Sequence, residues 1–101
     1  MKIKELVNIN VSLFGYNDIC DLLTNIGFYN VKIDNYVDLI ENGNISVQEK
    51  NGNWFTIWFE PATQKDEQTM LDYTETWYEG SYLDLDILRR INIRITKVEE
   101  N

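Results

Sequence analysis

Apolar and polar side chains alternate near both ends of the chain. Residues 9–13 read Ile-Asn-Val-Ser-Leu, and residues 91–96 read Ile-Asn-Ile-Arg-Ile-Thr. A period of two places the apolar side chains on one face of an extended backbone and the polar ones on the other. We therefore predict half-buried strands over roughly residues 6–14 and at residues 91–96.

After the first of these strands, the apolar residues recur with the period of a helix. Asn17 suits an N-cap, and Gly27 suits the left-handed residue that closes a helix. The apolar residues between these two positions recur at helical spacing: Ile19, Leu22, Leu23 and Ile26. This pattern predicts a helix over about residues 17–26. Residues 28–33 favour a second strand, and residues 34–42 favour a short helical turn that ends at Gly43.

The dipeptide Asn51-Gly52 predicts a β-hairpin. Both residues accept positive φ, as the two central positions of a type I′ turn require. A two-residue loop would place Glu49 opposite Trp54, Val47 opposite Thr56 and Ile45 opposite Trp58. The strand over residues 54–59 is apolar on both faces, because tryptophans alternate with Phe and Ile. One face can enter the core, and the other then needs a covering layer or a binding partner.

The segment after Pro61 is harder to assign. Residues 62–68 are polar and suggest a loop, whereas residues 69–78 are rich in Thr, Tyr and Trp and favour a strand over an alternative helical stripe. Residues 81–90 are compatible with a short helix capped by Ser81 or with a strand. Taken together, residues 1–101 predict one α+β domain, with an antiparallel sheet of five or six strands and one clear helix.

Charge is distributed unevenly along this chain. Residues 33–88 hold twelve acidic and two basic residues, a formal charge of −10, against −8 for the whole chain. Nine of the thirteen aromatic residues lie in the same stretch. Because charge accelerates encounter and buried rings stabilise a complex, this combination is typical of a surface that binds a basic protein.

Composition also argues against several classes of function. The chain has no histidine, which removes the commonest general base and most zinc sites. Cys20 is single and lies among apolar helix positions, so we expect a structural thiol. The sequence Asp84-Leu-Asp86 lacks the additional oxygen ligands of a calcium loop, and the glycines are too scattered for a phosphate loop. We therefore expect no metal, no cofactor and no enzymatic activity.

Membranes and nucleic acids are also unfavourable partners. The apolar runs are too short for a membrane span, and the N-terminal residues lack the features of a signal peptide, so we expect a cytoplasmic protein. A small basic cluster near the C-terminus would have to bind phosphates against a strongly negative molecule, which disfavours direct nucleic-acid binding.

The candidate partner-binding residues combine carboxylates with aromatic anchors. The densest group flanks Tyr73 between residues 72 and 79, and further candidates lie on either side of it. The predicted set is Trp58, Glu60, Asp72, Glu75, Trp77, Tyr78, Glu79, Asp84 and Asp86.

These observations lead to three functional hypotheses. The first is a non-enzymatic inhibitor, an immunity protein that occludes a basic toxin domain, plausibly a nuclease. The second is a phage or mobile-element protein that mimics nucleic acid and blocks a defence nuclease. The third, of another class, is a small-molecule-binding domain or a carboxylate-based enzyme. Rows of carboxylates would favour the mimic, an irregular patch centred on aromatic rings the immunity protein, and an enclosed pocket the third.

Overall fold

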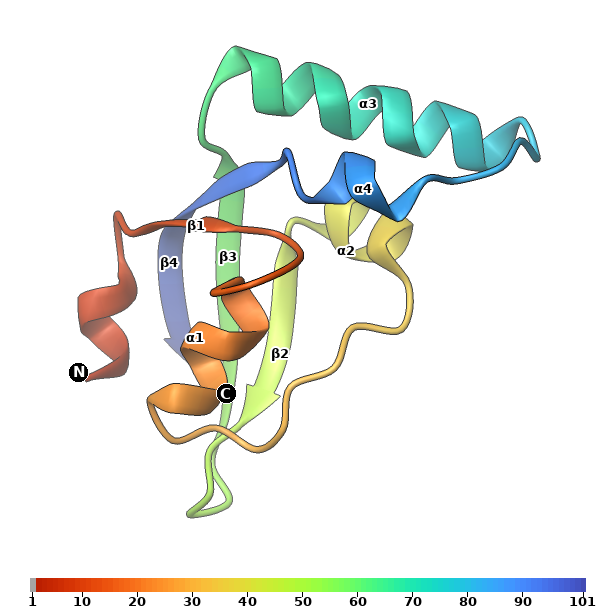
Figure 1. Ribbon diagram of the computed structural model, residues 1–101. Coiled ribbons are helices and arrows are strands. Elements are labelled where there is room, and N and C mark those ends of the chain that lie inside the picture. The colour runs from red at the N-terminus through yellow and green to blue at the C-terminus, as the bar shows by residue number, and fades with distance from the viewer. Residues whose placement is uncertain (1) are drawn as a thin grey trace.

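The computed structural model describes residues 2–101 and shows an α+β fold with one antiparallel sheet of four strands (Figure 1). The strand order across the sheet is β1-β4-β3-β2. The strands are β1 (Asn10–Ser12), β2 (Asn44–Gln48), β3 (Trp54–Pro61) and β4 (Asn92–Glu100). The helices are η1 (Ile3–Leu6, a 3₁₀ helix), α1 (Ile19–Asn25), α2 (Tyr36–Asn42), α3 (Gln64–Tyr78) and α4 (Leu85–Leu88).

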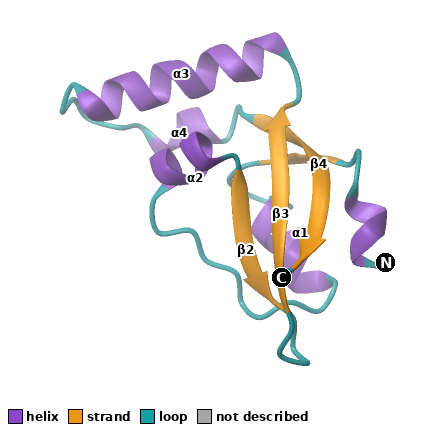
Figure 2. Cartoon of the chain, turned by 180° about the vertical axis from the view of Figure 1, so that it is seen from behind, coloured by secondary structure: helices purple, strands orange, loops and turns teal. Residues whose placement is uncertain are grey.

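Helices lie on one face and at one end of the sheet. Helix α1 packs on one face, and α2, α3 and α4 gather at the end where β3 finishes and β2 begins (Figure 1). Seen from behind, strands β2, β3 and β4 lie in front of α1, and none of the helices in residues 2–101 crosses this side of them (Figure 2). The core fills the space between the sheet and α1. It includes Ile57, Ile93 and Ile95 from the sheet and Ile19 and Leu23 from α1, all fully buried.

Several sequence predictions are confirmed. The helix expected over residues 17–26 is α1, although its N-cap is Asp18, one residue beyond Asn17. Asp18 is buried, and its carboxylate accepts hydrogen bonds from the backbone N–H groups of Gly15 and Asp21, at 3.0 Å each. The helical turn within residues 34–42 is α2, which ends at Gly43 with a φ of 68°. Both terminal strands are also present but with other bounds: β1 covers only Asn10–Ser12 of the predicted residues 6–14, because the 3₁₀ helix η1 extends to Leu6, and β4 continues beyond residue 96 to Glu100.

The hairpin forms, but with a different loop and register. Gly52 has a φ of 100° and donates its N–H to the Glu49 carbonyl, while Asn51 does not have positive φ. The connection is therefore a three-residue loop with a bulge at Gly52, not a type I′ turn. The longer loop shifts the pairing by one residue, so Ile45 lies opposite Ile57 and not opposite Trp58.

With this shift, the buried side chains of β2 and β3 share one face of the sheet and the exposed side chains share the other. Ile45 and Val47 lie on the same face as the Phe and Ile side chains of β3, which are Phe55, Ile57 and Phe59, and all five are buried. The tryptophans of β3 lie on the opposite, open face. The Phe and Ile face of β3 therefore enters the core, and the tryptophan face does not.

The strand predicted over residues 69–78 is wrong, because residues 64–78 form helix α3. The predicted polar loop over residues 62–68 contains the start of this helix. Thr63 and Asp66 form a reciprocal capping box, and Asp66, Met70 and Tyr73 are buried at helical spacing. Three threonine hydroxyls in α3 donate to backbone carbonyls four residues earlier, which accommodates a residue type that otherwise disfavours helices.

The predicted count of five or six strands is reduced to four for two reasons. One is the helix α3, and the other is the segment 28–33, where only an isolated bridge from Phe28 to Glu49 and a hydrogen bond from Tyr29 N–H to the Gln48 carbonyl form. Residues 81–90 contain the short helix α4, which is capped by Asp84 and not by Ser81.

Candidate protein-binding surface

The carboxylates of α3 form a ridge along its outer side. Asp72, Glu75 and Glu79 are spaced by three and four residues, which places them within about 60° of one another around the helix axis. All three are exposed, and they lie opposite the face that buries Met70 and Tyr73. The helical fold of this segment therefore brings together three of the predicted site residues.

Exposed aromatic side chains lie at the C-terminal end of α3, where Trp77 continues the side of the helix that carries Met70 and Tyr73, and Tyr78 lies between that side and the ridge. Trp77 is 43% exposed and Tyr78 is 62% exposed, and their rings meet edge to face at 5.0 Å between centroids. Tyr82, in the segment that leads to α4, is 90% exposed. Three aromatic side chains thus remain accessible at the end of α3 that projects beyond the sheet (Figure 1).

Helix α2 adds carboxylates that the sequence analysis missed. The phenol of Tyr78 donates a 2.6 Å hydrogen bond to Glu41 Oε1. This bond is the first cause of a raised pKa for Tyr78, followed by desolvation and by the negative charges of Glu41 and Asp38. No sequence pattern indicated that α2 and α3 are neighbours. We call the group Asp38, Glu41, Asp72, Glu75, Trp77, Tyr78, Glu79 and Tyr82 the acidic-aromatic end.

A groove between α2 and α3 adjoins this group. It has a volume of about 320 Å³ and is lined mainly by apolar side chains, among them Ile40, Met70 and Leu71. Leu71 is 51% exposed, and Glu41 and Glu67 belong to the lining. The groove is therefore an apolar hollow bordered by two carboxylates.

The structure separates two predicted residues from the rest. Trp58 and Glu60 lie on β3, where Trp58 is paired with Lys97 and Glu60 with Arg94. The Glu60 carboxylate also forms an ion pair with the Arg94 guanidinium. Both side chains belong to the open face of the sheet and not to the acidic-aromatic end.

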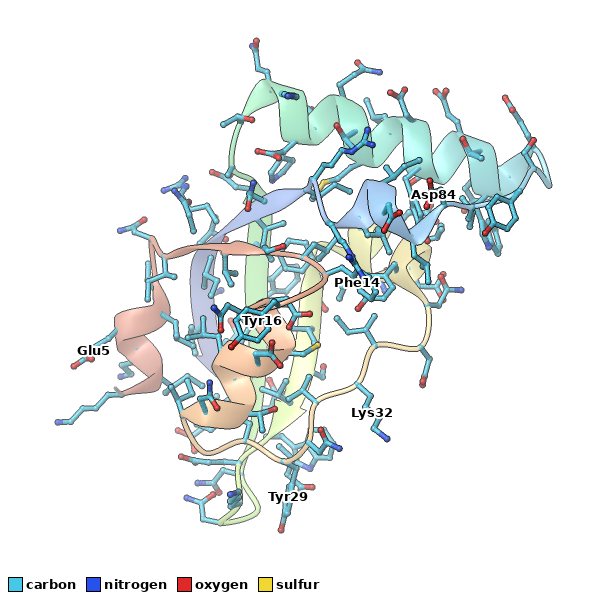
Figure 3. The ribbon with its side chains drawn as sticks, in the orientation of Figure 1. Glu5, Phe14, Tyr16, Tyr29, Lys32 and Asp84 are labelled. Atoms are coloured by element: carbon cyan, nitrogen blue, oxygen red, sulfur yellow. The ribbon has the colours of Figure 1, made fainter. Side chains whose placement is uncertain are left out.

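Asp84 and Asp86 lie at the start of α4, below α3, and Figure 3 labels Asp84 there. Asp84 accepts a hydrogen bond from the Asp86 N–H, and Asp86 lies 3.6 Å from the Arg89 guanidinium. Both are exposed, but their carboxylates already have partners within the chain.

The open sheet face carries a second tryptophan that was not among the predicted site residues. Trp54 is 49% exposed and Trp58 is 37% exposed, four residues apart on the same side of β3. The expectation that one aromatic face of this strand needs a cover is consistent with this exposure. The sequence feature that indicated this exposed tryptophan face was the apolar content of both faces of residues 54–59.

Two further observations concern metal ligands and the single thiol. Within residues 2–101 no group of three or more Cys, Asp or Glu side chains is arranged to hold a metal ion, and no helix could cross a membrane. Burial, together with the charges of Asp18 and Asp21, raises the pKa of Cys20 to about 11, which disfavours the reactive thiolate.

Comparisons with protein-family models, with curated proteins and with solved structures found no match for this chain.

Proposed function

We propose that this protein is a non-enzymatic inhibitor of the immunity type, which binds and occludes a basic toxin domain through its acidic-aromatic end. One observation carries the proposal: exposed carboxylates of α2 and α3 and three accessible aromatic rings belong to the same end of the molecule, where Tyr78 contacts both Glu41 and Trp77 (Figure 1). The sequence between Lys65 and Arg89 contains no basic residue that would neutralise them.

The mechanism is electrostatic attraction followed by burial of the rings. A field of one sign raises the rate of encounter with an oppositely charged protein, up to about 10⁸–10⁹ M⁻¹ s⁻¹ at low salt. Trp77 and Tyr78 then provide large contact areas of the kind that dominates binding energy at protein interfaces. Carboxylates placed where a nuclease holds phosphates would exclude its substrate.

A nucleic-acid mimic is the second candidate, and the ridge on α3 favours it. A helical rise of about 1.5 Å per residue separates Asp72, Glu75 and Glu79 by roughly 4.5 and 6 Å along the axis. The exposed aromatic rings at the C-terminal end of α3 favour the immunity protein, because a mimic needs few such anchors. Replacement of the rings tests this alternative: a mimic should keep its affinity when Trp77 and Tyr78 are replaced by Ala, whereas an immunity protein anchored by these rings should lose most of it.

The test is affinity capture from the native host at low and high salt. The first variant carries Asp72→Asn, Glu75→Gln and Glu79→Gln. The control variant removes the same charge from exposed positions elsewhere, with Glu5→Gln, Asp34→Asn and Glu100→Gln.

We expect the wild-type protein and the control to capture a basic protein at low salt. The ridge variant should bind it at least about tenfold more weakly, and high salt should reduce binding because it screens exposed charges. Recovery of no basic protein, or binding that ignores both salt and the ridge substitutions, would contradict the proposal.

A further inference from the structure

The groove between α2 and α3 has an apolar interior and a charged border. Ile40, Met70 and Leu71 supply aliphatic surface, and Thr74 contributes to the same lining. Leu71 is 51% exposed although it lies next to the buried Met70. A hollow of about 320 Å³ is large enough for one long side chain but small for a folded element.

The carboxylates at this border have no cationic partner within residues 2–101. The ion pairs within residues 2–101 involve other acidic residues, namely Asp86, Glu60 and Glu99. Glu41 accepts the Tyr78 hydroxyl, which is neutral, and Glu67 is exposed on the first turn of α3. Two negative charges therefore border an apolar hollow without neutralisation.

The nearest basic residue along α3 does not supply that partner. Lys65 lies two residues before Glu67, which places it about 160° further round the helix. Its side chain is thus directed away from the side of α3 on which Glu67 and Leu71 border the groove. The unpaired charge at the groove is available to a cation from outside the chain.

We propose that the groove binds an arginine or lysine side chain of the basic partner. The methylene stem packs on Leu71, Ile40 and Met70, and the cationic head reaches Glu41 and Glu67 at the border. Long basic side chains bury their stems on apolar surface while their charged heads stay near the solvent, so they match both features of the groove. The inference deepens the proposed function, on which its biological meaning rests, by naming the side chain that the groove recognises.

The test uses two small probes that share a shape and differ in charge. N-acetyl-arginine amide and N-acetyl-citrulline amide are titrated into the ¹⁵N-labelled full chain, and backbone amide shifts are followed by NMR. We expect saturable shifts at Glu41, Leu71 and Thr74 with the arginine probe and about fivefold weaker binding of the citrulline probe, the size that exposed ion pairs allow.

Variants separate binding in the groove from the general acidity of the protein. Glu41→Gln combined with Glu67→Gln should weaken the arginine probe about fivefold, and Leu71→Gln should weaken both probes. Glu5→Gln removes an exposed carboxylate on η1, far from the groove (Figure 3), and should change binding by less than twofold.

Two results would overturn the inference: equal affinity for both probes, or arginine-induced shifts spread over all exposed carboxylates. Neither result bears on the capture of a basic protein through the ridge on α3. Conversely, failure of that capture leaves the outcome of the probe titration unchanged, so the two proposals fail separately.

Discussion

The phenol Oη of Tyr78 donates a 2.6 Å hydrogen bond to Glu41 Oε1 and thereby joins the C-terminal end of α3 to α2. These residues are 37 positions apart in the sequence. The bond holds a carboxylate of one helix beside an exposed ring of the other. The acidic-aromatic end is therefore built by tertiary structure and not by one segment of the chain.

This bond predicts a dependence of stability on alkaline pH. The Glu41 carboxylate favours the neutral phenol and raises the pKa of Tyr78, and burial raises the pKa of Tyr73 and, to about 12, that of Tyr36. A pKa raised in the folded state adds stability below the ordinary value near 10, and this stability is lost as pH rises through the folded value. Denaturant unfolding should show stability falling above pH 10.

Glu41→Gln isolates the contribution of Tyr78 to this behaviour. Removing the negative charge should move one tyrosine towards its ordinary pKa in a spectrophotometric titration of phenolate absorbance. Tyr78→Phe should remove that same transition and leave the other raised tyrosines unchanged. Identical titration curves for Glu41→Gln and the wild-type protein would contradict the assignment.

Cys20 should react slowly with thiol reagents in the folded protein. Its pKa is raised from 9.0 to about 11, first by burial and then by the charges of Asp18 and Asp21. Two pH units correspond to about 100-fold less thiolate near pH 8, and thiolate is the reactive form. Absorbance after addition of an aromatic disulfide measures the rate. The denatured protein is the control and should react at least about 100-fold faster, whereas equal rates would contradict the prediction.

Asp66 should be important for folding, although it lies in the acidic stretch that suggested a binding surface. It is 5% exposed, and its carboxylate accepts the backbone N–H and hydroxyl of Thr63 and, at 2.9 Å, the N–H of Asn92. This one side chain completes the capping box of Thr63 at the start of α3 and attaches the helix to the start of β4.

Replacing Asp66 by Ala should lower the free energy of unfolding by about 3 kcal/mol, because it leaves the N–H groups of Thr63 and Asn92 without this acceptor and removes one half of the capping box. Chemical denaturation followed by circular dichroism measures the change. Asp72→Ala, on the exposed side of the same helix, should change stability by less than about 0.5 kcal/mol. Equal effects of the two substitutions would show that Asp66 is not a structural residue.

Local patterns predicted the elements whose signals are contained within a short segment. The alternation at residues 91–96 specified β4, and the apolar spacing between Asn17 and Gly27 specified α1, because in both cases one face is buried. Residues 69–78 favoured a strand in the sequence because Thr, Tyr and Trp prefer strands, whereas the capping box of Thr63 and Asp66 and the burial of Met70 stabilise a helix. Packing outweighed intrinsic preference there.

The candidate site was predicted only where its residues share one element. Asp72, Glu75 and Glu79 were identified from sequence density, and the helix places them on one ridge. Glu41 and Asp38 were missed because no local pattern reports which helices are neighbours. Trp58 and Glu60 were grouped with the ridge by charge and composition alone, and β3 carries them to a different face of the molecule.

The corrected hairpin register predicts opposite outcomes for two adjacent residues. Phe55 is 8% exposed and packs edge to face on Phe28 at 5.8 Å between ring centroids, whereas Trp54 is 49% exposed on the open face. Phe55→Ala should lower the free energy of unfolding by about 3–5 kcal/mol, as for other large core residues. Trp54→Ala should cost less, about 1–2 kcal/mol, because about half of the Trp54 side chain is already exposed to solvent in the folded protein.

Urea denaturation followed by far-ultraviolet circular dichroism compares the two variants without relying on tryptophan fluorescence. Val47→Ala provides a further check, since Val47 lies opposite Phe55 and is 3% exposed. It should destabilise the fold, while Ser46→Ala, on the open side of the same strand, should leave stability nearly unchanged. A large loss for Trp54→Ala together with a small loss for Phe55→Ala would mean that the tryptophan face of β3 forms the core.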